Sequence, residues 1–215
     1  MAVPLDAIRA FHNAFRKDML AMDTAAHNAA RGQGTLDLVL KRYTFFNEML
    51  AWHASGEEDY VFTALEKVAP LVAEAYQRDH RGLDSLSESL AAAVNTSDPL
   101  AIVRATSAYN FFSTFHLNKE EAHLYRIFNE RVTLPDQGAI IGKMSQKIPP
   151  SRFPEVITWL FPLIGLNDRE NMIKILQQVQ PKPMFETAIK LIQEAIGNDW
   201  AELTRRVPDL EPTTR

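Results

Sequence analysis

Apolar residues recur at helical spacing along four long segments of the chain. These segments cover residues 4–31, 35–67, 69–95 and 98–133. Positions three and four apart lie on one face of a helix, so each segment predicts an amphipathic helix with one inward stripe. The pattern breaks at the Gly32–Gly34 run, at Pro70, and at Ser97 or Asp98 as an N-cap before Pro99. No segment alternates with the period of two that marks a strand.

The order of the segments predicts an all-α fold: an up-down-up-down four-helix bundle over residues 1–134, followed by shorter helices over 135–215. Long helices joined by short breaks pack as antiparallel neighbours, which is the connectivity of such a bundle. Residues 136–215 differ in composition, because they hold most of the twelve prolines and none of the six histidines. The shorter helices are expected at about 137–147, 151–161, 167–180, 182–196 and 199–206. Their apolar residues need a covering surface, on the bundle, on a second chain or on another protein.

Histidine and glutamate interrupt the inward stripes in a repeated order. A lone histidine followed by His-x-x-x-Glu occurs twice, as His12 with His53 and Glu57, and as His80 with His116 and Glu120. Residues i and i+4 lie one turn apart, so each His-x-x-x-Glu directs an imidazole and a carboxylate to one place. Buried carboxylates are costly unless they are paired or bind a metal, and this set favours a two-metal site in the bundle core. The alternative is a metal-free hydrogen-bonded network, which would leave the carboxylates without a compensating charge.

Composition and charge narrow the classes of function. The 215 residues are 46% hydrophobic and 23% charged, with a net charge of −4, so we expect neither nucleic-acid binding nor a membrane surface. No apolar run is long enough for a membrane span. The amphipathic N-terminus lacks the apolar core of a signal peptide, so we expect a cytoplasmic protein. The absence of cysteine excludes disulfides, iron–sulfur clusters and thiolate ligands, which leaves histidine, carboxylate and tyrosine for any metal.

The repeated motif resembles that of the hemerythrin-like family, also called HHE cation-binding proteins, over about residues 5–130. The Glu57-Glu58 and Glu120-Glu121 pairs are similar to the paired acids of that family, in which the first acid is the ligand. The resemblance implies a non-haem di-iron centre with two oxo- or hydroxo-bridged iron ions. In that centre Glu57 and Glu120 would bridge the ions, and the terminal ligands would be His12, His53, His80 and His116. Residues 135–215 are similar to the helical extension of some bacterial members.

One position departs from the oxygen-carrying members of that family, which have His-x-x-x-His on the third helix. Here Tyr76 stands four residues before His80. Either Tyr76 ligates as a phenolate, which favours ferric iron, or its hydroxyl is hydrogen-bonded elsewhere and one iron keeps an open position. In both cases oxygen carriage like that of the invertebrate proteins is not expected. Around the ligands we expect a second-shell or surface role for His123, which lies on the inward stripe one turn beyond Glu120, and second-shell or salt-bridge roles for Glu58 and Glu121.

Three functions fit these residues. The sequence favours a di-iron protein of the oxidative-stress response that binds or reacts with oxygen, peroxide or nitric oxide, with peroxide or nitric oxide consumption as the candidate enzyme activity. The second is an iron or oxygen sensor that contacts a protein partner, or a second copy of the chain, through residues 136–215. The third is an iron store without turnover. Haem is disfavoured, because no Cys-x-x-Cys-His motif occurs, and zinc prefers closed four-ligand sites.

Overall fold

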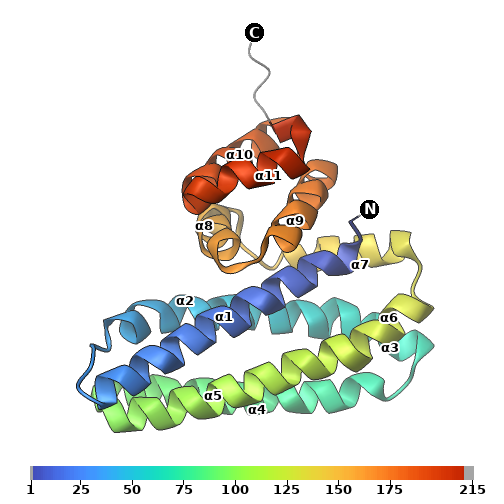
Figure 1. The fold of residues 1–215 in the computed structure, drawn as a ribbon. Helices are drawn as coiled ribbons and strands as arrows, with labels where there is room; N and C mark the ends of the chain where they lie inside the picture. The colour runs from blue at the N-terminus through green and yellow to red at the C-terminus, as the bar shows by residue number, and fades with distance from the viewer. Residues whose placement is uncertain (1, 211–215) are drawn as a thin grey trace. The chain divides into compact units, whose positions relative to one another are not determined.

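The computed structural model describes residues 2–210 and is helical throughout, with no strand in that range (Figure 1). This confirms the predicted all-α class. The four predicted long helices are present, and two of them contain a π-helical turn. Their parts are α1 (Pro4–Ala30), α2 (Asp37–Gly56) with the π turn η1 (Glu57–Phe62) and α3 (Thr63–Val68), α4 (Val72–Thr96), and α5 (Pro99–Lys119) with the π turn η2 (Glu120–Leu124) and α6 (Tyr125–Arg131).

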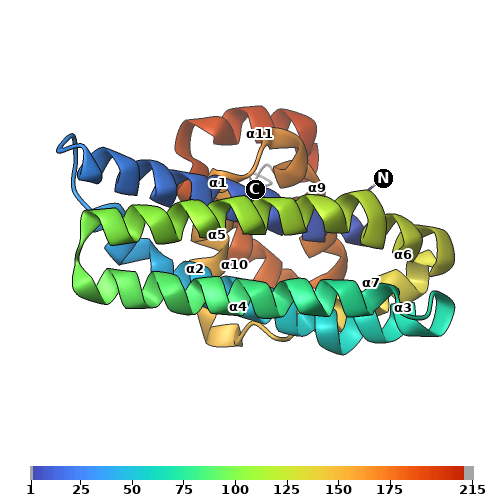
Figure 2. The same ribbon diagram turned by 90° about the horizontal axis from the view of Figure 1, so that it is seen from below.

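The bundle forms one compact unit over Phe15–Lys147. In this unit the long helical segments run alternately in opposite directions, as predicted (Figures 1 and 2). The unit also includes α7 (Leu134–Ser145), which packs against α2 and η1. Helix α7 is therefore part of the bundle unit, although its sequence lies beyond the predicted bundle.

The ends of the bundle helices follow from local backbone chemistry. The Asp98 side chain accepts a hydrogen bond of 3.0 Å from the Leu100 N–H, and Pro99 occupies the first turn of α5, which is the predicted cap. The third helix begins at Val72, two residues after the predicted start at Pro70. The reason is that Leu71 has a φ of 69°, a left-handed conformation that helical residues do not adopt.

Aromatic rings form the bundle core beside the predicted ligands. Phe46 contacts Phe15 and Tyr109 edge-to-face, each with a centroid separation of 5.8 Å. The Phe15 ring in turn lies 5.4 Å from the His53 imidazole. Such edge-to-face pairs add to the stabilisation from burial, and here they form an apolar wall next to the polar cluster.

A second compact unit combines the residues up to Ala14 with those from Ile148 onward. The helices that follow the bundle unit are η3 (Pro150–Arg152), α8 (Phe153–Leu163), α9 (Leu166–Val179), α10 (Lys182–Ile196), η4 (Gly197–Asp199), α11 (Trp200–Arg206) and η5 (Pro208–Leu210). Ala10 and Ala14 share a hydrophobic cluster with buried residues of these helices, such as Phe161 and Ile192. The first turns of α1 therefore supply part of the covering surface that the C-terminal apolar residues require.

The compact units divide the chain at 14/15 and at 147/148, whereas the sequence pattern suggested one boundary at 134/135. The physical reasons are the packing of α7 on η1 and the shared core of the first α1 turns with the C-terminal helices. The 134/135 boundary itself stays a prediction. None of the described helices combines the length and apolar character needed to cross a lipid bilayer.

Candidate metal centre

The structure buries all six predicted ligands. Their exposed fractions are at most 7%, for His12, His53, Glu57, His80, His116 and Glu120. They come from α1, from α2 and its π turn, from α4, and from α5 and its π turn. The helical phase read from the sequence therefore directs each of these side chains inward.

The ligand atoms form two groups, and within each group all atoms lie within 4.8 Å of one another. We call the group of His12, His53, Glu57 and Glu120 the His53 position, and the group of Glu57, His80, His116 and Glu120 the His80 position. Each position takes both histidines of one sequence repeat, and both glutamates belong to both positions. A metal ion could be held at either position, and this sharing is what bridging by two carboxylates would require.

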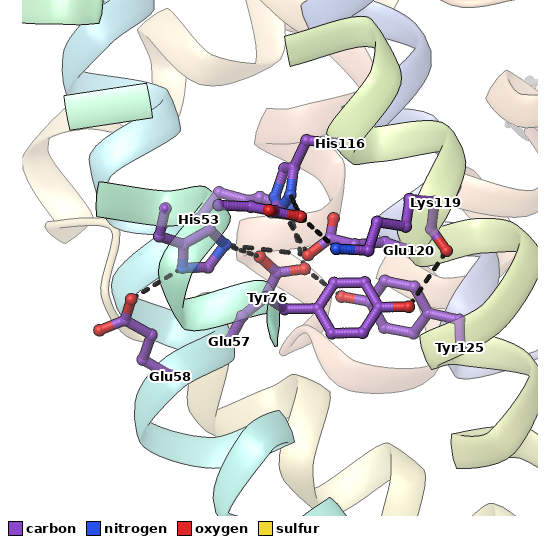
Figure 3. Close-up of polar contacts among 10 residues, drawn as sticks. His53, Glu57, Glu58, Tyr76, His116, Lys119, Glu120 and Tyr125 are labelled. Carbon is purple, nitrogen blue, oxygen red and sulfur yellow. Dashed lines mark hydrogen bonds and ion pairs between the residues drawn. The ribbon is translucent and has the colours of Figure 1, made fainter. Parts of the chain in front are cut away.

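Glu57 divides its carboxylate between the two positions (Figure 3). Its Oε1 lies 3.3 Å from the His53 Nε2, and its Oε2 lies 3.4 Å from the His80 Nε2. Within the described part of the chain, the buried Glu57 Oε2 and His80 Nε2 have no hydrogen-bond partner. Buried polar atoms in that state are costly, and a cation between them would satisfy both. The residues present therefore fit a bound metal.

Glu120 and the histidines near it complete the charge balance. The Glu120 Oε1 lies 3.2 Å from the His116 Nε2 and 3.8 Å from the His80 Nε2. Burial alone would lower the pKa of both imidazoles, but the neighbouring Glu120 and Glu57 carboxylates raise the pKa of His116 and raise that of His80 to about 11. Protonated imidazoles thus balance the carboxylates, and a metal ion would have to displace those protons.

Both glutamates are ionised in this cluster. Burial alone would raise the pKa of Glu57, but the adjacent His53 and His80 imidazoles hold it well below its ordinary value. Burial and the charge of Glu57 would raise the pKa of Glu120, but His116 and His80 lower it. The centre therefore offers two anionic oxygen ligands at neutral pH.

Two further acids contact the imidazoles of the His80 position at Nδ1, the ring nitrogen that does not face the other ligand atoms. The His80 Nδ1 lies 2.8 Å from the Glu58 Oε1, and the His116 Nδ1 lies 3.5 Å from the Asp79 Oδ2. Lys119 also donates to Asp79, at 2.6 Å. A carboxylate on Nδ1 fixes the ring so that Nε2 faces the metal position. Glu58 was among the residues expected around the ligands and Asp79 was not, although Asp79 adjoins His80 just as Glu58 adjoins Glu57.

Both π turns begin at a glutamate of the motif, η1 at Glu57 and η2 at Glu120. A π turn holds an extra residue, so the residues after it change their helical phase. A 3.6-residue period would place His123 on the inward stripe, one α-helical turn after Glu120, but the residue lies on the exposed surface, which is one of the two placements expected for it. The extra residue of η2 explains this difference. Glu121 forms an ion pair with Arg16 at 2.7 Å, in line with the expected salt-bridge role.

Two tyrosines lie near the ligands, in different environments (Figure 3). The Tyr76 hydroxyl donates to the Lys119 carbonyl oxygen at 3.4 Å, and the Lys119 ammonium lies 4.6 Å from the Tyr76 ring centroid. Burial, then the charge of Glu120, raises the pKa of Tyr76 to about 12. The Tyr125 hydroxyl instead donates to the Glu57 Oε1. Burial and the charge of Glu57 raise the pKa of Tyr125 well above its ordinary value.

The sequence pattern did not indicate Tyr125. It lies five residues after Glu120, and five residues of α-helix rotate a side chain far from the starting face, by about 140°. The π turn between these residues removes that difference in phase, so both reach the centre. No feature of the 3.6-residue periodicity reveals such a turn.

Comparisons with known proteins agree with this geometry. Residues 3–126 match the family described as the Hemerythrin HHE cation binding domain. The zinc finger protein BRUTUS of Arabidopsis thaliana is 25% identical over 193 residues, which are 86% of this chain and 15% of the relative. A BRUTUS-like zinc finger protein of the same plant is 20% identical over 184 residues, 81% of this chain and 15% of the relative. No solved structure matches the chain.

The two plant relatives are much longer than the region they share with this chain, which spans 15% of the length of each. Their names mention a zinc finger, but this chain contains no cysteine with which to build a thiolate zinc site. The zinc finger in the names of these relatives is therefore not carried over to this chain.

Proposed function

Because the chain belongs to the hemerythrin HHE cation-binding domain family, we propose that its bundle holds two iron ions and binds or reacts with a small oxidant or diatomic molecule. The observation that carries this proposal is the pair of four-residue groups that share Glu57 and Glu120. Two carboxylates common to two histidine pairs support a bridged two-ion centre better than two separate sites.

The donor set supports iron over other ions. Imidazole with carboxylate suits iron, and two histidines with shared carboxylates leave coordination positions free for an exogenous small molecule. Zinc in closed structural sites favours four dedicated ligands, commonly cysteine, which this chain lacks. Bound iron would supply Lewis acidity and a change of oxidation state. The ligands would be His12 and His53 for one ion, His80 and His116 for the other, and the two glutamates for both.

The surroundings of the centre support a small reactant. Phe62 stacks on the His80 imidazole with a centroid separation of 5.3 Å, and Phe15 lies against His53 on the other side. With every ligand at most 7% exposed, the centre excludes bulk water and large substrates. Oxygen, peroxide and nitric oxide are of the size that such a buried site admits, and a role in oxidative stress would follow from the last two.

The experiment that tests this proposal is the metal content per chain, with a visible spectrum before and after addition of azide and of peroxide. We expect about two irons per chain and an absorption that changes with azide. Glu120→Gln should lose most of the metal, because it alters a ligand of both positions. Glu121→Gln is the matched control, because Glu121 is the acid next to Glu120 but forms an ion pair with Arg16. One zinc per chain, or equal iron in both variants, would overturn the proposal.

A metal-dependent regulatory role is the second candidate function, and one observation favours it. Helix α7 packs on η1, the π turn that begins at the ligand Glu57. Met144 of α7 lies against Gly56, and Lys147 forms an ion pair with Asp59 of the π turn. A change at Glu57 on metal binding would therefore be transmitted directly to α7.

Hydrogen exchange of α7 separates the regulatory role from a purely reactive one. If iron occupancy controls a partner contact, removal of iron should increase exchange in α7 and in η1 together, and Asp59→Asn should do so in the iron-loaded protein. Exchange in α4 is the internal control, because α7 packs mainly on η1 and α2. Equal protection of α7 with and without iron would refute metal control through this helix.

A further inference from the structure

Tyr125 contacts the metal centre directly, and neither the motif nor the family match assigns it a role. Its side chain is 4% exposed, and its hydroxyl donates to the Glu57 Oε1. Its ring packs edge-to-face on Phe128 with a centroid separation of 6.4 Å. A buried tyrosine with a packed ring has few rotamers, so its hydroxyl is a fixed hydrogen-bond donor.

The hydrogen bond from Tyr125 falls on one oxygen of Glu57 and leaves the other available. The Oε1 faces His53 at 3.3 Å, and the Oε2 faces His80 at 3.4 Å without a hydrogen-bond partner of its own. The terminal torsion of glutamate is broad, so a carboxylate without a fixed donor can turn both oxygens toward one ion. A donor on Oε1 opposes that rotation.

The π turn η2 is the structural device that brings Tyr125 to this place. Glu120 begins the turn and Tyr125 follows its last residue, Leu124. Because of the extra residue in the turn, one helix presents both Glu120 and Tyr125 to the centre. Tyr125 therefore lies in the same helical segment as Glu120 of the second repeat, but it donates its hydrogen bond to Glu57 of the first repeat.

We propose that Tyr125 is a positioning residue, whose hydroxyl holds the Glu57 carboxylate with Oε1 toward the His53 position and Oε2 toward the His80 position. The inference rests on the proposed two-metal function, since it concerns how one carboxylate serves two ions. Tyr125 acts through Glu57 and contributes no atom to the metal itself. Loss of its hydroxyl should weaken metal binding by roughly 10- to 100-fold, the usual effect of removing a hydrogen bond to a metal ligand.

The test compares Tyr125→Phe with Tyr76→Phe in the full chain. Both variants remove one buried hydroxyl near the centre, but that of Tyr76 donates to the Lys119 carbonyl and not to a ligand. Metal-free protein is titrated with Co²⁺ under argon, in competition with a chelator, and the d–d absorption of bound Co²⁺ reports the ligand geometry. Thermal unfolding of both metal-free variants checks that each folds.

We expect wild type and Tyr76→Phe to bind two Co²⁺ with the same spectrum. Tyr125→Phe should bind more weakly, with a changed d–d spectrum, while its metal-free form still unfolds cooperatively, at a somewhat lower temperature because a buried hydrogen bond to a carboxylate is lost. Equal affinity and spectra for the two variants would overturn the inference about Tyr125 but leave the proposed function unaffected. Loss of a phenolate-to-iron absorption in ferric Tyr125→Phe would also overturn it, because Tyr125 would then be a ligand. Wild type without a two-metal stoichiometry would overturn the proposed function, and this inference with it.

Discussion

Gly56 is the position where a single added methyl group should disturb the packing of α7 on the bundle. An alanine Cβ at residue 56 would lie 2.4 Å from the Met144 Cγ and 3.3 Å from the Met144 Cβ. The first distance is far inside van der Waals contact, so Met144 or α7 has to move. The close approach at this glycine is therefore to α7.

The expected magnitude is the sum of two opposing effects. Extra methylene groups in a packed core cost about 1–3 kcal/mol, and replacement of a helical glycine by alanine gains about 1 kcal/mol. The flexible Met144 side chain can absorb part of the clash, so Gly56→Ala should destabilise the protein by roughly 1 kcal/mol. For a chain of this size, that corresponds to a fall in the unfolding temperature of about 2–4 °C.

Gly142→Ala is the matched control, because this exposed glycine lies in α7 and an added Cβ would meet nothing within 4 Å. It should stabilise the protein by about 0.4–1 kcal/mol. Urea unfolding of both single variants, of Met144→Ala and of Gly56→Ala/Met144→Ala gives the coupling energy between the two sites. The double variant should be less destabilised than the sum of its parts. A Gly56→Ala protein that is as stable as Gly142→Ala would refute the packing argument.

Three further predictions follow from the site and its scaffold. Glu58→Gln should weaken Co²⁺ binding by roughly 10- to 100-fold, while Glu121→Gln leaves it unchanged, because Glu58 contacts the ligand imidazole of His80 and Glu121 pairs with Arg16. Folding raises the pKa of His80, so its protonated form stabilises the metal-free protein against unfolding. This contribution is complete below about pH 6.5 and is lost as the pH rises toward about 11. A urea midpoint that does not fall between pH 6 and pH 10 would contradict this. Asp98→Ala should cost about 1 kcal/mol in urea unfolding, through loss of its cap.

The features that the sequence predicted are those set by local periodicity and backbone chemistry. An inward stripe of period 3.6 fixes the face of each helix, and so the burial of residues such as His12 and His80. Local chemistry also predicts ends, as at Asp98 and at Gly197, where a φ of 55° ends α10 after the predicted Ile196. These properties depend on neighbours a few residues away, which a single sequence displays.

The features that could not be predicted depend on a change of period or on contacts between distant segments. A 3.6-residue period carried through Glu120 places His123 inward and Tyr125 outward, and η2 reverses both. The Asp79–Lys119 pair joins two helices, and no spacing within either helix reveals it. The packing of α7 on η1 is of the same kind, since it depends on a small residue, Gly56, meeting a distant side chain.

Residues of the two sequence repeats contact each other in the centre, so metal binding at one position should affect binding at the other. Each position takes its histidines from one repeat, yet Glu57 of the first repeat faces His80 of the second and accepts the hydrogen bond of Tyr125. An ion at one position would therefore orient the shared carboxylates for the other position and displace a proton from an imidazole that faces them. Metal should bind cooperatively, with little singly loaded protein at half saturation. If the two positions bound their ions independently, the titration would instead show two separate affinities and a substantial amount of singly loaded protein.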